Sequence, residues 1–449
     1  MGLQGHLEPG PAGLRSVETR AAGLDRRAVR DSRTVSLRSS ETDPGRNCSL
    51  RRSHDTRVTR RDILMKITGL TAHLMGIPGP GGHSPARNWI FVKVETDEGV
   101  VGIGEATTEY HELAVMAMIE GHLADLLIGQ DPTRINYIWQ QMRRFYWWRD
   151  GVVATSAASG IDQALWDILG KVTGQPVYKL LGGAVRDRIR LYARGDLGLP
   201  SQGEEMRTAA AEGFDAFKFG PGQYVKPYDD EKQVDVALAV AREIREAGGP
   251  DVELMIDCGG IFSLQAAHRL TEGLRDEVGM LFVEEPVNMD TPDGLISLRQ
   301  SFPDVRIAAG ERNMTRWGFR EWLEGGAVDV VQPDIAHAGG ISELMRIASY
   351  AEIHNVTVAP HNPYGPVALA AAAHAAAAMP NFLILEHCRH RPWLDEVQVQ
   401  GPRVVNGGIT LEDTPGLGVE LDWDYVNANP YQALNLRTFH DRDNALPLI

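Results

Sequence analysis

The chain has 449 residues, 43% of them hydrophobic and 23% charged, fractions that are typical of a soluble globular protein and exclude a mainly disordered one. Asp and Glu outnumber Lys and Arg by 60 to 45, and the net charge of −15 argues against nucleic acid or an anionic membrane as the main partner. Its 3 cysteines lie far apart, so no disulfide framework is predicted. The chain contains no uncharged apolar run of about 18 residues, so no transmembrane helix is predicted. We therefore expect a cytoplasmic protein.

The first 64 residues differ in composition from the rest of the chain. They contain 13 arginines, no lysine and eight acidic residues, so this stretch is basic although the whole chain is acidic. It shows no sustained apolar period and is rich in Arg, Ser and Gly. We expect residues 1–64 to form a disordered basic extension. The sequence Met65–Thr68 resembles a natural start, which favours a true start downstream of this extension.

Residues 65–188 are predicted to form an α+β domain. The apolar runs Trp89–Val94 and Val100–Ile103 flank a turn that ends in Gly99, where a hairpin needs positive φ. From residue 111 to about 180 the pattern is helical, with one apolar face at Ile161, Ala164, Leu165 and Ile168.

From residue 189 onward, short apolar runs alternate with helical stretches such as Arg316–Glu324. The runs are Ile189–Ala193, Ala216–Phe219, Val252–Ile256, Met280–Val283, Val305–Ala308, Val328–Val331, Val356–Ala359 and Phe382–Leu385. Alternating strands and helices predict a parallel sheet, and eight units predict a closed (β/α)8-type barrel over residues 189–391. No clear eighth helix follows, and we expect residues 392–449 to pack back on the first domain.

Single polar residues stand just beyond these apolar runs. They are Lys218, Asp257, Glu284, Glu311, Asp334, His361 and Glu386. From Asp257 onward they follow one another every 23 to 27 residues, about one strand–helix unit. Because the carboxyl ends of barrel strands surround one mouth, we expect these side chains to meet there.

Three of the carboxylates, Asp257, Glu284 and Glu311, come from consecutive strands. A single carboxylate at a strand end is usually a helix cap or a surface charge, but three in register repel one another and lose hydration. A bound divalent cation removes this cost, and oxygen ligands without Cys or His favour Mg²⁺ over Zn²⁺. The sequence therefore predicts a magnesium site, which would also supply a local cation for an anionic substrate.

Several motifs resemble one known family. They are Phe282–Pro286, Ala309–Arg312, Gln332–Asp334 with Gly339 and Gly340, and Ala359–His361. They resemble the mandelate racemase/muconate-lactonizing branch of the enolase superfamily, and within it the galactonate dehydratases. The resemblance covers residues 65–425 and implies an α/β fold, a modified TIM (β/α)7β barrel with an α+β capping domain built from the N-terminal segment and the chain tail.

The resemblance also implies roles for the polar residues. It implies that Asp257, Glu284 and Glu311 bind Mg²⁺. It implies that His361, paired with Asp334, removes the proton α to a carboxylate, and that Glu386 stabilises the enolate. Relatives with a Lys-x-Lys pair use its second lysine as a base, but here that position is Gly220. Lys218 is therefore expected to orient the substrate carboxylate.

A second difference from the family concerns the acid that expels hydroxide. Galactonate dehydratases carry a histidine two residues after the first metal ligand, and this chain has Gly259 there. Either His361 returns its own proton to the leaving group or another side chain is the acid, with Arg194, Asp196 and Tyr224 as substitutes. His83, in a Gly- and Pro-rich loop, is expected to contact the substrate from the cap.

These inferences favour Mg²⁺-dependent dehydration of an aldonate-like acid sugar to a 2-keto-3-deoxy acid. The alternative within the same enolate chemistry is an epimerase or another isomerase of a carboxylic acid. A non-catalytic regulatory protein that binds an acid sugar is the alternative of another class, and Gly259 is the feature in its favour. Members of this family are commonly homo-oligomers, so we expect one here.

Overall fold

The computed structural model describes residues 65–77, 87–144, 147–195, 198–222, 230–389 and 393–433. The extension expected over residues 1–64 lies outside the described residues, and so do His83, Asp196 and Tyr224. Residues 61–449 form one compact unit, and the account below concerns its described part.

The N-terminal part of this unit is an antiparallel sheet with helices. Its strands are β1 (Ile67–Ile77), β2 (Arg87–Thr96) and β3 (Val101–Glu105), paired in that order. The predicted hairpin joins β2 to β3, with Gly99 at φ 77°. The helices are α1 (Glu112–Met118), η2 (Ile119–Leu123), α2 (Ala124–Leu127), α3 (Ile135–Arg144), α4 (Val152–Thr173) and α5 (Val177–Leu180). Helix α4 packs closely on β3, because a Cβ on Gly104 would overlap the carbonyl oxygen of Gly160.

Eight parallel strands follow and form the barrel. They are β4 (Ile189–Arg194), β5 (Ala216–Phe219), β6 (Glu253–Asp257), β7 (Phe282–Glu284), β8 (Ile307–Ala309), β9 (Val330–Val331), β10 (Thr357–Val358) and β11 (Leu385–His387). Each strand from β4 to β10 pairs with the next one in the sequence. Strand β11 pairs with β4, and Leu383 N donates to Val358 O at 2.8 Å, so the circuit of strands closes.

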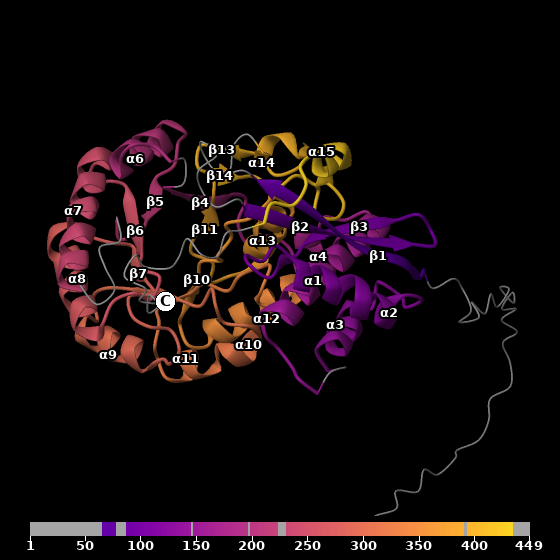
Figure 1. The fold of residues 1–449 in the computed structure, drawn as a ribbon, viewed down its shortest axis with the longest axis horizontal. Coiled ribbons are helices and arrows are strands. Elements are labelled where there is room, and N and C mark those ends of the chain that lie inside the picture. The colour runs from indigo at the N-terminus through magenta and orange to yellow at the C-terminus, as the bar shows by residue number, and fades with distance from the viewer. Residues whose placement is uncertain are drawn as a thin grey trace, which may run out of the picture. The chain divides into compact units, whose positions relative to one another are not determined.

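Helices lie outside the strands, as Figure 1 shows for α6 to α9 beside β5 to β7. They are α6 (Gln202–Ala211), α7 (Asp230–Gly248), α8 (Leu264–Glu277), α9 (Asp293–Ser301), α10 (Thr315–Gly318), α11 (Arg320–Glu324), α12 (Gly340–Glu352) and α13 (Pro366–Ala378). In the described chain, the first helix after β11 is the single turn of α14 (Trp393–Glu396). The barrel therefore has the predicted (β/α)7β form. Across the described residues, no helix combines the length and apolar character needed to span a membrane.

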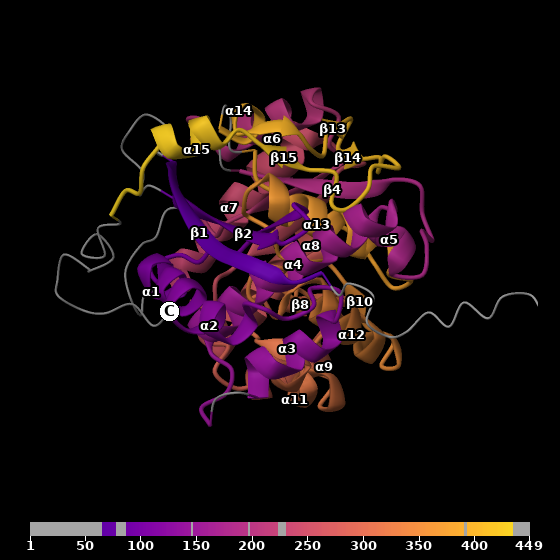
Figure 2. The same ribbon diagram turned by 90° about the vertical axis from the view of Figure 1, so that its right-hand side faces the viewer.

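The tail returns to earlier parts of the fold. Its elements are β12 (Gln398–Gln400), β13 (Val404–Val405), β14 (Gly408–Ile409), β15 (Glu420–Leu421) and α15 (Trp423–Ala428). Strand β14 pairs antiparallel with β4. Near α15, Gly76 N at the end of β1 donates to Asn429 O at 2.9 Å, and the two segments lie side by side in Figure 2.

Buried polar side chains join the N-terminal part to the barrel. The Glu105 carboxylate accepts hydrogen bonds from the backbone N–H groups of Gly365, at 2.8 Å, and Ala368, at 2.9 Å, at the start of α13. Asp162 on α4 accepts one from Ser342 N, at 2.9 Å, at the start of α12. Both carboxylates thus cap barrel helices whose first N–H groups have no partner within the helix.

Candidate active site

The predicted polar residues occupy one layer inside the barrel mouth. The layer beneath them is a buried apolar cluster that includes Tyr192, Ala216, Met255, Phe282, Val330, Ala359 and Ile384. Side chains two positions apart on a strand point the same way. The residues two positions further along are Arg194, Lys218, Asp257, Glu284, Gln332, His361 and Glu386.

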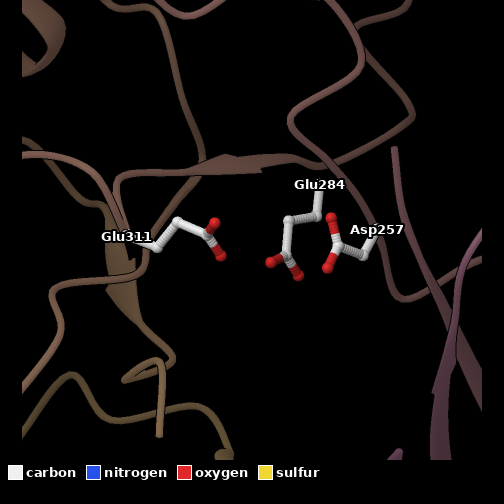
Figure 3. A group of neighbouring side chains, drawn as sticks. All are labelled: Asp257, Glu284 and Glu311. Carbon is white, nitrogen blue, oxygen red and sulfur yellow. The ribbon is translucent and has the colours of Figure 1, made fainter. Parts of the chain in front are cut away.

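Asp257, Glu284 and Glu311 form a compact acidic cluster. One carboxylate oxygen from each lies within 4.8 Å of the other two, and Figure 3 shows the three side chains turned toward one another. Glu311 follows β8 after Gly310, whose φ is 128° and whose Cβ position lies against the ring of Phe319. A side chain at residue 310 would be strained and crowded, so this turn requires glycine.

Lys218 balances only part of the negative charge of this cluster, in which Glu284 is fully buried. Burial, together with the charges of Asp257 and Glu311, raises the pKa of Glu284 to about 8, although Lys218 acts in the opposite direction. A cation among the three would reverse this shift. The donors are all carboxylate oxygens, which suit a hard divalent ion. The cluster can therefore hold a metal ion.

Lys218 lies beneath the cluster and is fully buried. Its Nζ is 2.9 and 3.0 Å from the two carboxylate oxygens of Glu284 and 3.1 Å from Glu386 Oε1. Burial lowers the pKa of Lys218, but Glu284 and Glu386 raise it well above its usual value. The side chain therefore stays an ammonium and is not a proton acceptor.

Replacing Lys218 by Met is expected to lower the free energy of unfolding by about 3–5 kcal/mol, because the buried carboxylates lose their nearest cation. The measurement is urea unfolding in EDTA. Lys179→Met is the matched control, since the ammonium of Lys179 is exposed and pairs with exposed Asp413, and it should leave stability nearly unchanged. Equal stability of the Lys218→Met variant and the original protein would show that the cluster does not depend on this ammonium.

His361 faces the acidic cluster from the opposite strands. Its Nδ1 lies 2.5 Å from Asp334 Oδ2, and its Nε2 lies 3.3 Å from Glu311 Oε2 and 3.6 Å from Glu386 Oε2. Because ionised Asp334 only accepts hydrogen bonds, Nδ1 carries the proton. In the neutral ring, Nε2 then presents a lone pair to the cluster.

Nearby charges make His361 basic. Burial lowers the pKa of His361, but Glu311, Glu386 and Asp334 raise it to about 10. A cation that neutralises Glu311 would bring this pKa back toward neutral pH, where a base is most useful.

Glu386 is buried between cations. Burial raises its pKa, but Lys218, His361 and Arg194 outweigh this and hold the pKa of Glu386 far below its usual range. Its Oε2 also accepts a hydrogen bond from Asn362 N at 3.0 Å. Glu386 is therefore ionised when no ligand is bound.

Arg194 brings a second permanent cation to the mouth. Its guanidinium nitrogens lie 3.8 Å from Asp257 Oδ2 and 3.8 Å from Glu386 Oε1, and its side chain is 31% exposed. Burial lowers the pKa of Arg194, but neighbouring anionic groups, Glu386 and Asp257 among them, raise it well above its usual value. Arg194 thus suits the binding of an anion better than the donation of a proton.

Gln332 belongs to this layer although sequence reasoning gave it no role. It is 1% exposed, and among the described residues neither atom of its side-chain amide has a hydrogen-bond partner. An unpaired buried polar group costs about 1–3 kcal/mol, so a bound molecule is its natural partner. The two-residue spacing from Val330 is the sequence signal that places Gln332 in this layer.

Comparison with known proteins agrees with this geometry. Residues 83–182 match the family model of the mandelate racemase/muconate lactonizing enzyme N-terminal domain, and residues 202–425 match that of the enolase C-terminal domain-like family. A (β/α)7β barrel with an acidic cluster that can hold a metal ion, opposite an imidazole, is typical of enolase-type enzymes. The chain belongs to the mandelate racemase/muconate-lactonizing branch of the enolase superfamily.

Its relatives identify the class of enzyme within this branch. D-galactonate dehydratase of Ralstonia pickettii is 41% identical over 366 residues, which are 80% of this chain and 92% of that one. The enzyme of that name from Xanthomonas oryzae pv. oryzae is 40% identical over 377 residues, covering 82% and 95% of the two chains. The chain is thus an enzyme of the dehydratase type, a hydro-lyase.

Solved structures show the same fold. One from Agrobacterium radiobacter, provisionally assigned as a galactarate dehydratase and bound to sodium and L-malate, superposes with a TM-score of 0.75. It is 32% identical, and the match covers 85% of this chain and 99% of that one. A dehydratase structure from Mesorhizobium loti gives a TM-score of 0.74 at 33% identity, covering 82% and 99%.

Proposed function

We propose that this enzyme catalyses Mg²⁺-dependent dehydration of an aldonate-like acid sugar to a 2-keto-3-deoxy acid. The observation that carries the proposal is the position of His361, whose Nε2 lies 3.3 Å from one of three clustered carboxylates. The names of the curated relatives support an acid sugar as substrate.

Asp257, Glu284 and Glu311 are proposed to hold Mg²⁺, since their oxygens lie within reach of one ion and Lys218 compensates their charges only in part. When bound, the ion would neutralise the substrate carboxylate and stabilise the additional negative charge of the enediolate. Lys218 and Arg194 are proposed to orient that carboxylate, and Gln332 to bond a substrate hydroxyl.

His361 is proposed to remove the α-proton through Nε2, while its Nδ1–H donates to Asp334. The electrons of the broken C–H bond then form the enediolate. Glu386 is proposed to stabilise its charge after taking up a proton from solvent when the substrate carboxylate binds, with the Lys218 ammonium as its neighbour. Loss of the β-hydroxyl leaves an enol, which becomes the 2-keto acid.

The leaving hydroxyl needs a proton, and position 259 does not supply one. A Cβ on Gly259 would meet no described atom within 4 Å, so the space that a histidine would fill there is open in the described structure. We propose that His361 returns the α-proton to the leaving hydroxyl as water departs. The α-hydrogen and the hydroxyl would then leave from one face of the substrate, a syn elimination.

Incubation with a panel of acid sugars and Mg²⁺ is expected to give a 2-keto acid, detected as its semicarbazone, from at least one aldonate-like compound. Absence of a 2-keto acid product from all aldonates, aldarates and uronates would contradict the proposal. Exchange of the α-proton in D₂O without a keto product would instead identify an epimerase or isomerase. Binding without exchange or turnover would identify a regulatory protein.

We also propose how the chain is organised. Residues 65–188 and the tail 392–449 would form the capping domain over the barrel of residues 189–391, supported by the contact of Asn429 with Gly76. We propose a homo-oligomer that acts in the cytoplasm, as is common for metabolic enzymes of this family.

A further inference from the structure

Asp334, the partner of His361, has a second side-chain donor. Its Oδ2 accepts hydrogen bonds from His361 Nδ1 at 2.5 Å and from the Tyr364 hydroxyl at 2.7 Å. Its Oδ1 accepts from the backbone N–H groups of Ala336, at 2.7 Å, and His337, at 3.0 Å. Four donors therefore fix this buried carboxylate in one orientation.

The Tyr364 hydroxyl continues the chain of hydrogen bonds. It lies 2.7 Å from His337 Nε2, and His337 Nδ1 lies 2.8 Å from Ser156 Oγ. Because the only hydroxyl proton of Tyr364 goes to Asp334, His337 must donate from Nε2. The bonds among His361, Asp334, Tyr364 and His337 therefore have a defined direction, and the His337 ring continues them to Ser156.

Packing holds the members of this chain in place. The rings of His337 and His361 both lie edge-on to Tyr364, at interplanar angles of 80° and 88°. Burial, with the charge of Asp334, raises the pKa of Tyr364 well above its usual value, so the phenol remains a donor. Ser156 is buried on α4, the helix that packs on the antiparallel sheet formed by β1, β2 and β3.

We propose that Tyr364 and His337 are positioning residues that orient the His361–Asp334 pair and connect it to Ser156 on helix α4. The inference rests on the proposed function, because it gives His361 the role of base. Without the Tyr364 hydroxyl, Asp334 loses one of two side-chain donors and can rotate, carrying the imidazole with it. A small misplacement of a base can lower the rate of its step by roughly 100-fold.

The first test is Tyr364→Phe, which removes only the hydroxyl. We expect kcat and the rate of α-proton exchange in D₂O to fall by roughly 10- to 100-fold, with KM and Mg²⁺ affinity little changed. Tyr178→Phe is the matched control, because its hydroxyl bonds exposed Asp413 on another part of the fold and should not affect either rate. A Tyr364→Phe variant within about two-fold of the original in both rates would overturn the proposal.

A second test examines whether the chain acts as a unit. Tyr364→Phe and His337→Gln are expected to be non-additive, since both interrupt the same run of hydrogen bonds. Additive losses in kcat would contradict a connected chain. Thermal unfolding of each variant shows whether a lower kcat comes from loss of the fold or from misplacement of the His361 imidazole in a folded protein.

A third readout does not depend on turnover. The short hydrogen bond of His361 to Asp334 should give a far-downfield proton resonance that disappears in His361→Asn. Tyr364→Phe is expected to shift this resonance, whereas Tyr178→Phe should not, and an unmoved resonance would count against the proposal. If no acid sugar is turned over, the proposed function fails while the resonance still decides whether Tyr364 positions His361.

Discussion

Replacing His361 by Asn is expected to lower kcat for dehydration by roughly 1,000-fold, within the range for a positioned acid or base. Asn can still donate to Asp334 but has no group that takes a proton at the position of Nε2. The proposed mechanism uses this nitrogen twice, so both α-proton exchange and release of water should stop together. Steady-state kinetics and exchange in D₂O measure the two steps.

His354→Asn is the matched control, because this partly exposed histidine follows α12 and contacts Tyr350 rather than the mouth. It should leave kcat unchanged. If His361→Asn still exchanges the α-proton at the original rate, another residue is the base and the mechanism fails.

Replacing Glu284 by Gln is expected to reduce turnover in millimolar Mg²⁺ by more than the ~10- to 100-fold typical of residues that only support metal ligands. The substitution removes one ligand charge and one of the three carboxylates that pair with Lys218. EDTA should reduce the activity of the original protein to the same low level. Added Mg²⁺ should restore the activity of the original protein but should not raise that of the variant.

Thermal unfolding gives a measurement without substrate. At 100 times its dissociation constant, Mg²⁺ should stabilise the original protein by about 2.7 kcal/mol, and Glu284→Gln should lose this response. Glu253→Gln is the control, since this carboxylate lies at the opposite end of β6 and pairs with Arg190. A Glu284→Gln variant that responds to Mg²⁺ like the original protein would place the metal elsewhere.

The barrel strands could be predicted from the sequence, but not all of their ends. The run Ala216–Phe219 coincides with β5, whereas Val328–Val331 and Val356–Ala359 are longer than β9 and β10. Val328 and Ala359 are buried although neither lies in a strand. Apolar character therefore marks burial and does not show where strand pairing stops.

The helix expected over Arg316–Glu324 forms as two short helices, α10 and α11, which meet at Phe319. Phe319 is fully buried, and its ring lies against the Cβ position of Gly310. This contact joins residues on two elements and so has no local signal in the sequence.

The acidic cluster and His361 could be predicted because a barrel repeats, which turns an interval of about 25 residues into a shared position at the mouth. Tyr364 could not, since it lies in a loop three residues beyond His361 and its role depends on His337 and Ser156. Hydrogen bonds between separate elements leave no period in the chain.

The capping of α12 and α13 by Asp162 and Glu105 limits how this protein can be recombined. A chimaera could take its N-terminal part from another family member and keep the barrel of this chain. The backbone N–H groups of Ser342, Gly365 and Ala368 would then lack their hydrogen-bond acceptors. Unless the donor carries equivalent carboxylates, the loops that hold Asp334 and His361 would loosen. Exchange of specificity between relatives should therefore proceed by grafts of single loops more readily than by whole-domain swaps.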